Sequence, residues 1–170
     1  MNIQQIRNIN NLDKLQRILE ELKTKKVIIG IFGANDSHIL MVARVQEFGC
    51  DIQVTEKMRA YLHYQGLHLR KETTSIHIPE RSFIRRTPQE RQSEIDNVVK
   101  EGMNRLLTFE IDVTGFYNLV GQALVGITQE VLTSGGYEPN HPFTIEQKGG
   151  KSTPLINTGR LRESITWKVE

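Results

Sequence analysis

Apolar residues recur at helical spacing in the first third of the chain. Residues 11 to 24 carry leucine and isoleucine on one face and charged residues on the other, which predicts an amphipathic helix. Residues 39 to 48 show the same spacing and end before Gly49, a residue that suits the end of a helix. A third helix is predicted from Thr55, whose hydroxyl can cap its first turn, to Tyr64.

The longest regular pattern lies between residues 87 and 134 and predicts a pair of long helices. Thr87, Pro88 and Glu90 make a strong helix start, because Thr can cap, Pro suits the first helical position and Glu completes a capping box. Apolar residues then share one face of each helix, and the second begins at Thr114 and ends before two glycines. Two helices of this length dominate the expected fold.

Strand patterns are short and few. Residues 27 to 33, VIIGIFG, form a β-branched run typical of a buried strand, and a loop over residues 34 to 37 follows. Residues 67 to 78, LHLRKETTSIHI, alternate on both sides of a polar stretch and predict a β-hairpin. Residues 164 to 169 alternate again and predict a last strand. The fold class is therefore α+β, with a small, mostly antiparallel sheet packed against two long helices.

A long loop is predicted between the helical pair and the last strand. Residues 135 to 157 hold four of the five glycines after position 130 and three of the five prolines. A loop of this length inside a compact domain needs a purpose. We expect a flexible arm that a neighbouring subunit orders, followed by one helical turn, capped by Thr158, through Glu163.

Composition bounds the class of protein. With 170 residues, one domain over residues 1 to 170 is expected. Hydrophobic residues make up 38% and charged residues 25%, which suits a flat or extended protein whose core neighbours complete. A net charge of +2 is too small for a protein that binds mainly by neutralising phosphates. The first residues have no apolar signal-peptide region and no run approaches a membrane span, so we expect cytosolic synthesis and no membrane partner.

Side chains that carry chemistry are sparse. We find no nucleophile with its base, no paired carboxylates, no metal cluster and no phosphate loop, so we expect neither an enzyme nor a cofactor. His63, His68 and His77 lie near one another in sequence but lack further ligands at metal spacing, and solvent-facing strand histidines are the favoured interpretation. Cys50 is interpreted as a small buried hydrophobe. The spacing of Gly30 and Gly33 indicates a turn at the end of a strand.

Residues 79 to 86, PERSFIRR, place three arginines around Phe83 and Ile84 ahead of a predicted helix. One interpretation is a buried apolar pair flanked by solvated arginines. Another is a contact with carboxylates of a second subunit, since Arg is enriched at interfaces; nucleic acid is a third. In the second long helix Gly121 and Gly126 indicate close approach by another backbone, from this chain or from a neighbour.

Three separated stretches carry a resemblance to a known family. They are VARVQEFG, residues 42 to 49; IPERSFIR, residues 78 to 85; and TIEQK, residues 144 to 148, with PLINTGRLRESI, residues 154 to 165. In this order they resemble the "hEFG", "IPxRxFIR", "TIxxKG" and "PLIxTGxLxxSI" elements of the phage head-tail joining and tail completion family, also called neck or virion morphogenesis proteins. The insertion over residues 52 to 76 is longer than the shortest members need.

The resemblance implies a structural protein that completes a phage tail and joins it to the head. It implies a ring around the DNA channel, a hexamer or alternatively a dodecamer, in the virion after synthesis in the bacterial host cytoplasm. Implied partners are a head-side connector or adaptor, tail terminator or tube proteins, and DNA that passes without sequence-specific binding. The source can be a phage, a prophage or a headless tail-like particle.

The residues expected at an assembly interface are those of the arginine segment, the arm and the closing segment. Trp167 is expected to pack on the core or on a neighbour. Rival functions are a tail tube terminator or adaptor, a DNA-contacting channel protein and a small enzyme. The expected interface residues are Arg81, Phe83, Arg85, Arg86, Tyr137, Lys148, Thr158, Gly159, Arg160 and Trp167.

Overall fold

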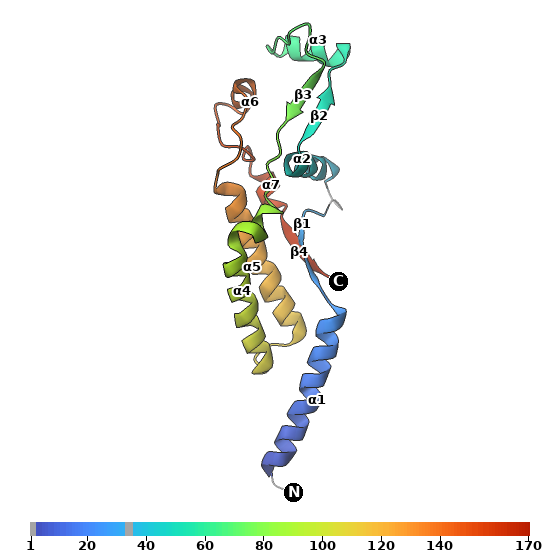
Figure 1. Cartoon of the computed structure of the whole chain (residues 1–170), viewed down its shortest axis with the longest axis vertical. Coiled ribbons are helices and arrows are strands. Elements are labelled where there is room, and N and C mark those ends of the chain that lie inside the picture. The colour runs from blue at the N-terminus through green and yellow to red at the C-terminus, as the bar shows by residue number, and fades with distance from the viewer. Residues whose placement is uncertain (1–2, 33–35) are drawn as a thin grey trace. The chain divides into compact units, whose positions relative to one another are not determined.

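The computed structural model describes residues 3–32 and 36–170, and the side chains of residues 11–32 and 36–170 (Figure 1). The fold is α+β, and within this part of the chain it has seven helices and four strands. They are α1 (Ile3–Thr24), β1 (Val27–Gly30), α2 (Ser37–Phe48), β2 (Cys50–Gln53), α3 (Glu56–Tyr64), β3 (Ser75–Ile78), α4 (Arg86–Leu107), α5 (Val113–Thr133), α6 (Pro142–Gln147), α7 (Arg160–Glu163) and β4 (Thr166–Val169).

The chain divides into two compact units, each built from separated parts of the sequence. Unit 1 consists of Met1–Gly30, Thr87–Thr128 and Ile165–Glu170, and unit 2 consists of Ile31–Arg86 and Gln129–Ser164. α4 and α5 each contribute residues to both units: Arg86 of α4 and residues 129–133 of α5 are assigned to unit 2, and the rest of both helices to unit 1. The predicted helical pair is confirmed, and α1 begins eight residues before the predicted start at residue 11.

Unit 1 is organised around the apolar faces of α4 and α5. The core there consists of buried residues of both helices, against which Ile18 and Leu22 of α1 and Val27 of β1 pack. The hydroxyl of Tyr117 donates to the carbonyl oxygens of Leu22 (3.1 Å) and Lys25 (2.8 Å), so the end of α1 is tied to α5. The buried residues are Leu106, Val113, Phe116, Tyr117 and Val120.

The β1 and β4 strands form an antiparallel pair in unit 1, with Val27 opposite Val169 and Gly30 opposite Thr166. Trp167 of β4 reaches α5 at Gly121, where an added Cβ would lie 2.1 Å from the ring carbon Cδ1 of Trp167. The close approach predicted at Gly121 is therefore made by a side chain and not by a backbone. Nothing in the described chain lies within 4 Å of a Cβ at Gly126, so this chain makes no close approach there.

Unit 2 contains the second antiparallel pair, in which β2 pairs with β3 from Cys50 opposite Ile78 to Gln53 opposite Ser75. The hairpin predicted over residues 67 to 78 is therefore wrong in its first arm. Residues 67–70 are not a strand, and β3 pairs instead with β2, which lies before α3 in the sequence. The predicted cap of α3 is confirmed, since Thr55 accepts the Met58 N–H at 3.2 Å.

The segment between α5 and β4 is more regular than predicted. Residues 142–147 form α6, with Pro142 at the first position and His141 accepting the Phe143 N–H. Gly159, at φ 90°, is the N-cap of α7, and no side-chain bond caps this helix, so the predicted role of Thr158 as its cap is wrong. A positive φ at the cap favours glycine over threonine.

Two features of the N-terminal third complete the fold. β1 ends at Gly30, and Gly33, Ala34 and Asn35 of the predicted strand end and loop lie outside the described residues. Asp36 caps α2 by accepting the Ile39 N–H at 3.0 Å. Among the helices that the structure describes, none has the length and apolar character that a membrane crossing needs.

Candidate functional site: contacts around helix α2

The carboxylate of Glu47 lies at the centre of unit 2. Ile39, Ala43 and Glu47 recur every four residues along α2 and are its buried residues, and Glu47 is 4% exposed. Its oxygens accept the backbone N–H groups of the turn before α4 and a serine hydroxyl, and such charge-assisted bonds are the strong ones. The donors are Phe83 (2.8 Å), Ile84 (3.0 Å), Arg85 (3.0 Å) and the Ser82 hydroxyl (2.7 Å).

These donors decide the ionisation of Glu47. Burial alone raises the pKa of its carboxyl, but the hydrogen bonds from Ile84, Ser82, Arg85 and Phe83 outweigh burial and hold that pKa below its ordinary value. The bound turn leads directly into α4, whose N-terminus also favours a negative charge. Glu47 is therefore ionised at neutral pH and links α2 to the start of α4.

Gly49 allows the same two segments to meet through their backbones. It ends α2 at φ 66°, and an added Cβ would lie 2.9 Å from both the Ile78 carbonyl oxygen and the Glu80 nitrogen. Only a glycine tolerates both the left-handed conformation and this approach. In the Glu-Phe-Gly stretch, Glu47 thus binds residues 82–85 with its carboxylate, and Gly49 lets the backbone pack closely against residues 78–80.

Arg81 joins α2 to the segment that follows α5. Its side chain is buried, and its guanidinium donates to the Glu138 carbonyl (2.9 Å), the Pro139 carbonyl (3.2 Å) and the Gln46 side chain (3.0 Å). The Arg81 N–H donates to the Gln46 carbonyl at 2.7 Å. Arg81 is thus not a solvated arginine, because its guanidinium is bound within unit 2.

The other members of the arginine segment are also used within unit 2. Phe83 is fully buried, as the interpretation of a buried apolar pair expects for it. Arg85 donates to the Glu47 carbonyl (2.5 Å) and to Glu80 (2.9 Å), and stacks 4.6 Å above the Phe48 ring. Arg86 donates to the Gly135 carbonyl (2.9 Å) and stacks over the Tyr137 ring.

Four of the expected interface residues line one pocket of about 340 Å³ against α2. They are Lys148, Thr158, Gly159 and Arg160, and α2 contributes the other wall with His38, Ile39, Val42 and Gln46. Arg160 forms an ion pair with Asp36, the N-cap of α2. Lys148 donates to the Thr153 carbonyl at 2.6 Å, and burial, then the charges of Arg81 and Lys151, lower its pKa.

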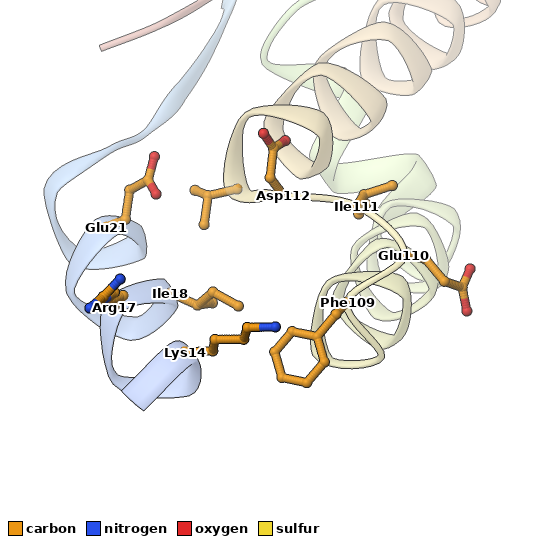
Figure 2. A pocket seen from close by; sticks show the side chains of 9 residues that line it. Lys14, Arg17, Ile18, Glu21, Phe109, Glu110, Ile111 and Asp112 are labelled. Carbon is orange, nitrogen blue, oxygen red and sulfur yellow. The ribbon is translucent and has the colours of Figure 1, made fainter. Parts of the chain in front are cut away.

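A second pocket of about 510 Å³ lies in unit 1, between α1 and the turn from α4 to α5 (Figure 2). Ile18 and Ile111 form apolar walls, and Lys14 lies 5.4 Å from the centre of the Phe109 ring. Phe109 has φ 62°, a conformation that bulky residues rarely adopt. The last of the expected interface residues, Trp167, also lies in unit 1, where it packs on α5 at Gly121.

No family model, curated protein or solved structure matches this chain. The three stretches that resemble the head-tail joining family meet at α2: the first forms the helix, the second binds Glu47 and Gln46, and the third lines the pocket beside it.

His63, His68 and His77 make local contacts in unit 2. The Nδ1 atoms of His63 and His68 are 2.7 Å apart, and His77 bonds Asp51 at 2.8 Å. Among the described residues no group of three or more potential ligands gathers to hold a metal ion. Cys50 is half-buried in β2, so it is less enclosed than predicted.

Sequence analysis missed Glu47 as a central residue, although the sequence contains the signal. Ile39, Ala43 and Glu47 share one face of α2 at spacings of four, so a carboxylate lies on the apolar face of an amphipathic helix. A buried acid needs donors. Those donors are backbone N–H groups more than thirty residues away, and residue type does not identify them in the sequence.

Proposed function

We propose that this chain is a structural protein of the phage head-tail junction, which completes the tail and joins it to the head as a ring around the DNA channel. The supporting observation is the convergence of the three family-like stretches on α2. Residues 78–85 contact residues 42–49 through Gln46 and Glu47, and residues 155–161 line a pocket whose other wall includes Val42 and Gln46.

The chemistry around α2 supports a scaffold more than a reaction centre. The carboxylate of Glu47 and the guanidinium of Arg81 are bound by backbone groups and by the side chains of Ser82 and Gln46, which fixes their geometry. Such a network makes the segments around α2 rigid. Rigid surfaces suit a protein that must present one geometry to two different assemblies.

Loss of the gene in the phage or prophage that encodes this chain tests the proposal. We expect lysates with DNA-filled heads and separate tails, seen by electron microscopy, and infectious joined particles after addition of the purified chain. As a negative comparison, we expect purified Glu47→Ala protein not to restore joining. Joined, infectious particles in the absence of the gene would contradict the proposal.

The same lysates separate the nearest alternative, a tail tube terminator. A chain that only terminates the tube is needed for tails of defined length, so its loss gives tubes of irregular length. The proposed function predicts tails of normal length that lack heads. Tail length measured on micrographs therefore distinguishes the two functions.

A further inference from the structure

The pocket of about 340 Å³ beside α2 combines apolar walls with positive charge. It is named the α2 pocket, and all of its lining residues belong to unit 2. A few polar groups in a mainly apolar pocket are the usual composition of a ligand site. Among the described residues that line it none is an Asp or a Glu, whereas His38, Lys148 and Arg160 carry or can take up a positive charge. Its apolar lining includes Ile39 and Val42 of α2 and, on the opposite wall, Leu155 and Leu161.

The apolar wall opposite α2 is held by a tight turn. The Ile156 N–H donates to the Pro154 carbonyl at 2.7 Å, which closes a three-residue γ-turn, and Leu155 at its centre has φ 62°. Large side chains rarely adopt this conformation, and residues held in it cluster where a protein grips a ligand. Ile39 and Leu161 are buried, so these lining residues belong to the packed interior. The pocket therefore offers a fixed aliphatic surface.

Lys148 supplies a cation whose charged neighbours are also cations. Its ammonium donates to the Thr153 carbonyl at 2.6 Å, two residues before Leu155, and its two other donors remain for solvent or a ligand. Burial lowers the pKa of Lys148, and the charges of Arg81 and Lys151 lower it further. Among the described residues no acid pairs with Lys148. A bound anion would supply the missing counter-charge.

The other cations around the α2 pocket each have an acid of this chain. Arg160 forms an ion pair with Asp36, so these two charges balance. Arg81 binds the lining residue Gln46, and the carboxylate of Glu138 acts on its charge. The positive charge that remains for a ligand is therefore that of the lysine and not that of either arginine.

We propose that the α2 pocket binds a segment of a partner protein in which an aliphatic side chain lies next to a carboxylate. The aliphatic side chain contacts the wall around Leu155, and the carboxylate binds the ammonium of Lys148. Glu163 lies beside Gly159 and disfavours an anion on that side of the pocket. Complementary charge of this kind selects a partner and fixes its register. The identity of the partner as a head or tail component rests on the proposed function, whereas the binding itself rests on the pocket alone.

Two probes that differ in one group test the pocket on the full wild-type chain. N-acetyl-leucine carries an aliphatic side chain beside a carboxylate, and N-acetyl-leucinamide has a neutral amide in place of that carboxylate. Two-dimensional NMR follows the backbone amides of residues 38–46 and 140–161 during each titration. We expect the acid to bind with a dissociation constant on the order of 1 mM, and the amide to bind at least about tenfold more weakly. Equal binding of the two probes, or shifts only outside these residues, would overturn the proposal.

Substitution of Lys148 tests its part in the binding. Lys148→Met removes the ammonium and keeps an unbranched side chain, so we expect the acid to bind at least about tenfold more weakly and the amide to bind as before. Lys148→Arg keeps the positive charge and should recover most of the binding. The matched control is Lys71→Met, at an exposed lysine of the same unit outside the pocket, and it should bind the acid like the wild type. Wild-type affinity in Lys148→Met, or an equal loss in Lys71→Met, would contradict the proposal. The comparison of the two probes on the wild type needs no substitution, so it decides the matter even if Lys148→Met does not fold.

The outcomes separate the pocket from the proposed function. If the acid binds as expected but the purified chain does not join heads and tails, the pocket stands and the function fails. If the chain joins heads and tails but binds both probes equally, the function stands and the pocket fails. Sedimentation velocity identifies the source of the segment, because self-association that Lys148→Met abolishes would place a second copy in the pocket and overturn its assignment to a different protein.

Discussion

In unit 1 the buried residues are mainly apolar side chains, whereas in unit 2 a carboxylate and a guanidinium, those of Glu47 and Arg81, lie among them. Unit 1 gains stability from apolar surface that folding removes from water. Because its core is closely packed, it tolerates small changes in side-chain shape poorly. Unit 2 depends in addition on hydrogen bonds that need specific partners and one ionisation state. The two units should therefore respond differently to substitution and to pH.

Removal of the Glu47 carboxylate should have the largest effect and should act on unit 2. Glu47→Ala leaves the N–H groups of residues 83–85 without their acceptor and should cost about 3–5 kcal/mol. Native-state hydrogen exchange at these amides measures it. Glu80→Ala is the control, because Glu80 is an exposed acid that bonds the same Arg85 and should cost less than about 1 kcal/mol. Equal losses in the two variants would contradict the central position of Glu47.

A methyl group at Gly121 should break unit 1 instead. Gly121→Ala places Cβ 2.1 Å from Cδ1 of Trp167 and should cost about 1–3 kcal/mol through displaced packing. Gly126→Ala is matched to it, on the same helix with open space, and should stabilise by up to about 1 kcal/mol. Denaturant unfolding compares the two variants. A neutral Gly121→Ala would show that Trp167 does not rest on α5.

Acid should weaken unit 2 before unit 1. Because the folded-state pKa of Glu47 is below its unfolded value, its contribution is complete above the unfolded pKa and is lost as pH falls through the folded pKa. The effect is smaller than that of Glu47→Ala, since a protonated carboxyl still accepts hydrogen bonds. Hydrogen exchange with decreasing pH should open residues 83–85 first in the wild type. The stability difference from Glu47→Gln should shrink over the same range, and a constant difference would contradict this.

Substitution of the exposed Phe48 should have the smallest effect on folding. Phe48→Gln removes an exposed ring and its contact with Arg85, which is worth about 0.5–1 kcal/mol at an exposed site. Thermal unfolding should therefore change by only a few degrees. A large loss of stability would mean that the Phe48 ring contributes more to the fold than its exposure indicates.

Prediction from sequence succeeded where the signal is local. The faces of α4 and α5, the end of α2 at Gly49 and the cap Thr55 depend on neighbours within a few residues, and all were predicted. The pairing of β2 with β3 was not predicted, because strands 50–53 and 75–78 carry no sign of which partner each takes. Residues 67–70 alternate apolar and polar side chains as a strand does, but alternation alone does not determine whether a partner strand pairs with them.

The candidate site shows the same division. The motifs were predicted as a set, yet the contacts that unite them were not. In the sequence Arg81 resembles any surface arginine. In the fold its guanidinium donates hydrogen bonds to the carbonyl oxygens of residues 138 and 139, which follow α5. Long-range acceptors of this kind are backbone atoms, so no side-chain pattern announces them.

The position of the chain in the assembled particle tests the proposed function most directly. Electron cryomicroscopy of purified particles from the phage or prophage that encodes it should resolve density for the α4–α5 pair and for α2 with its Glu47 contacts. The proposed function predicts several copies of this chain in a closed ring between the head and the tail. Particles that lack the chain, or that carry it only at the distal end of the tail, would contradict it.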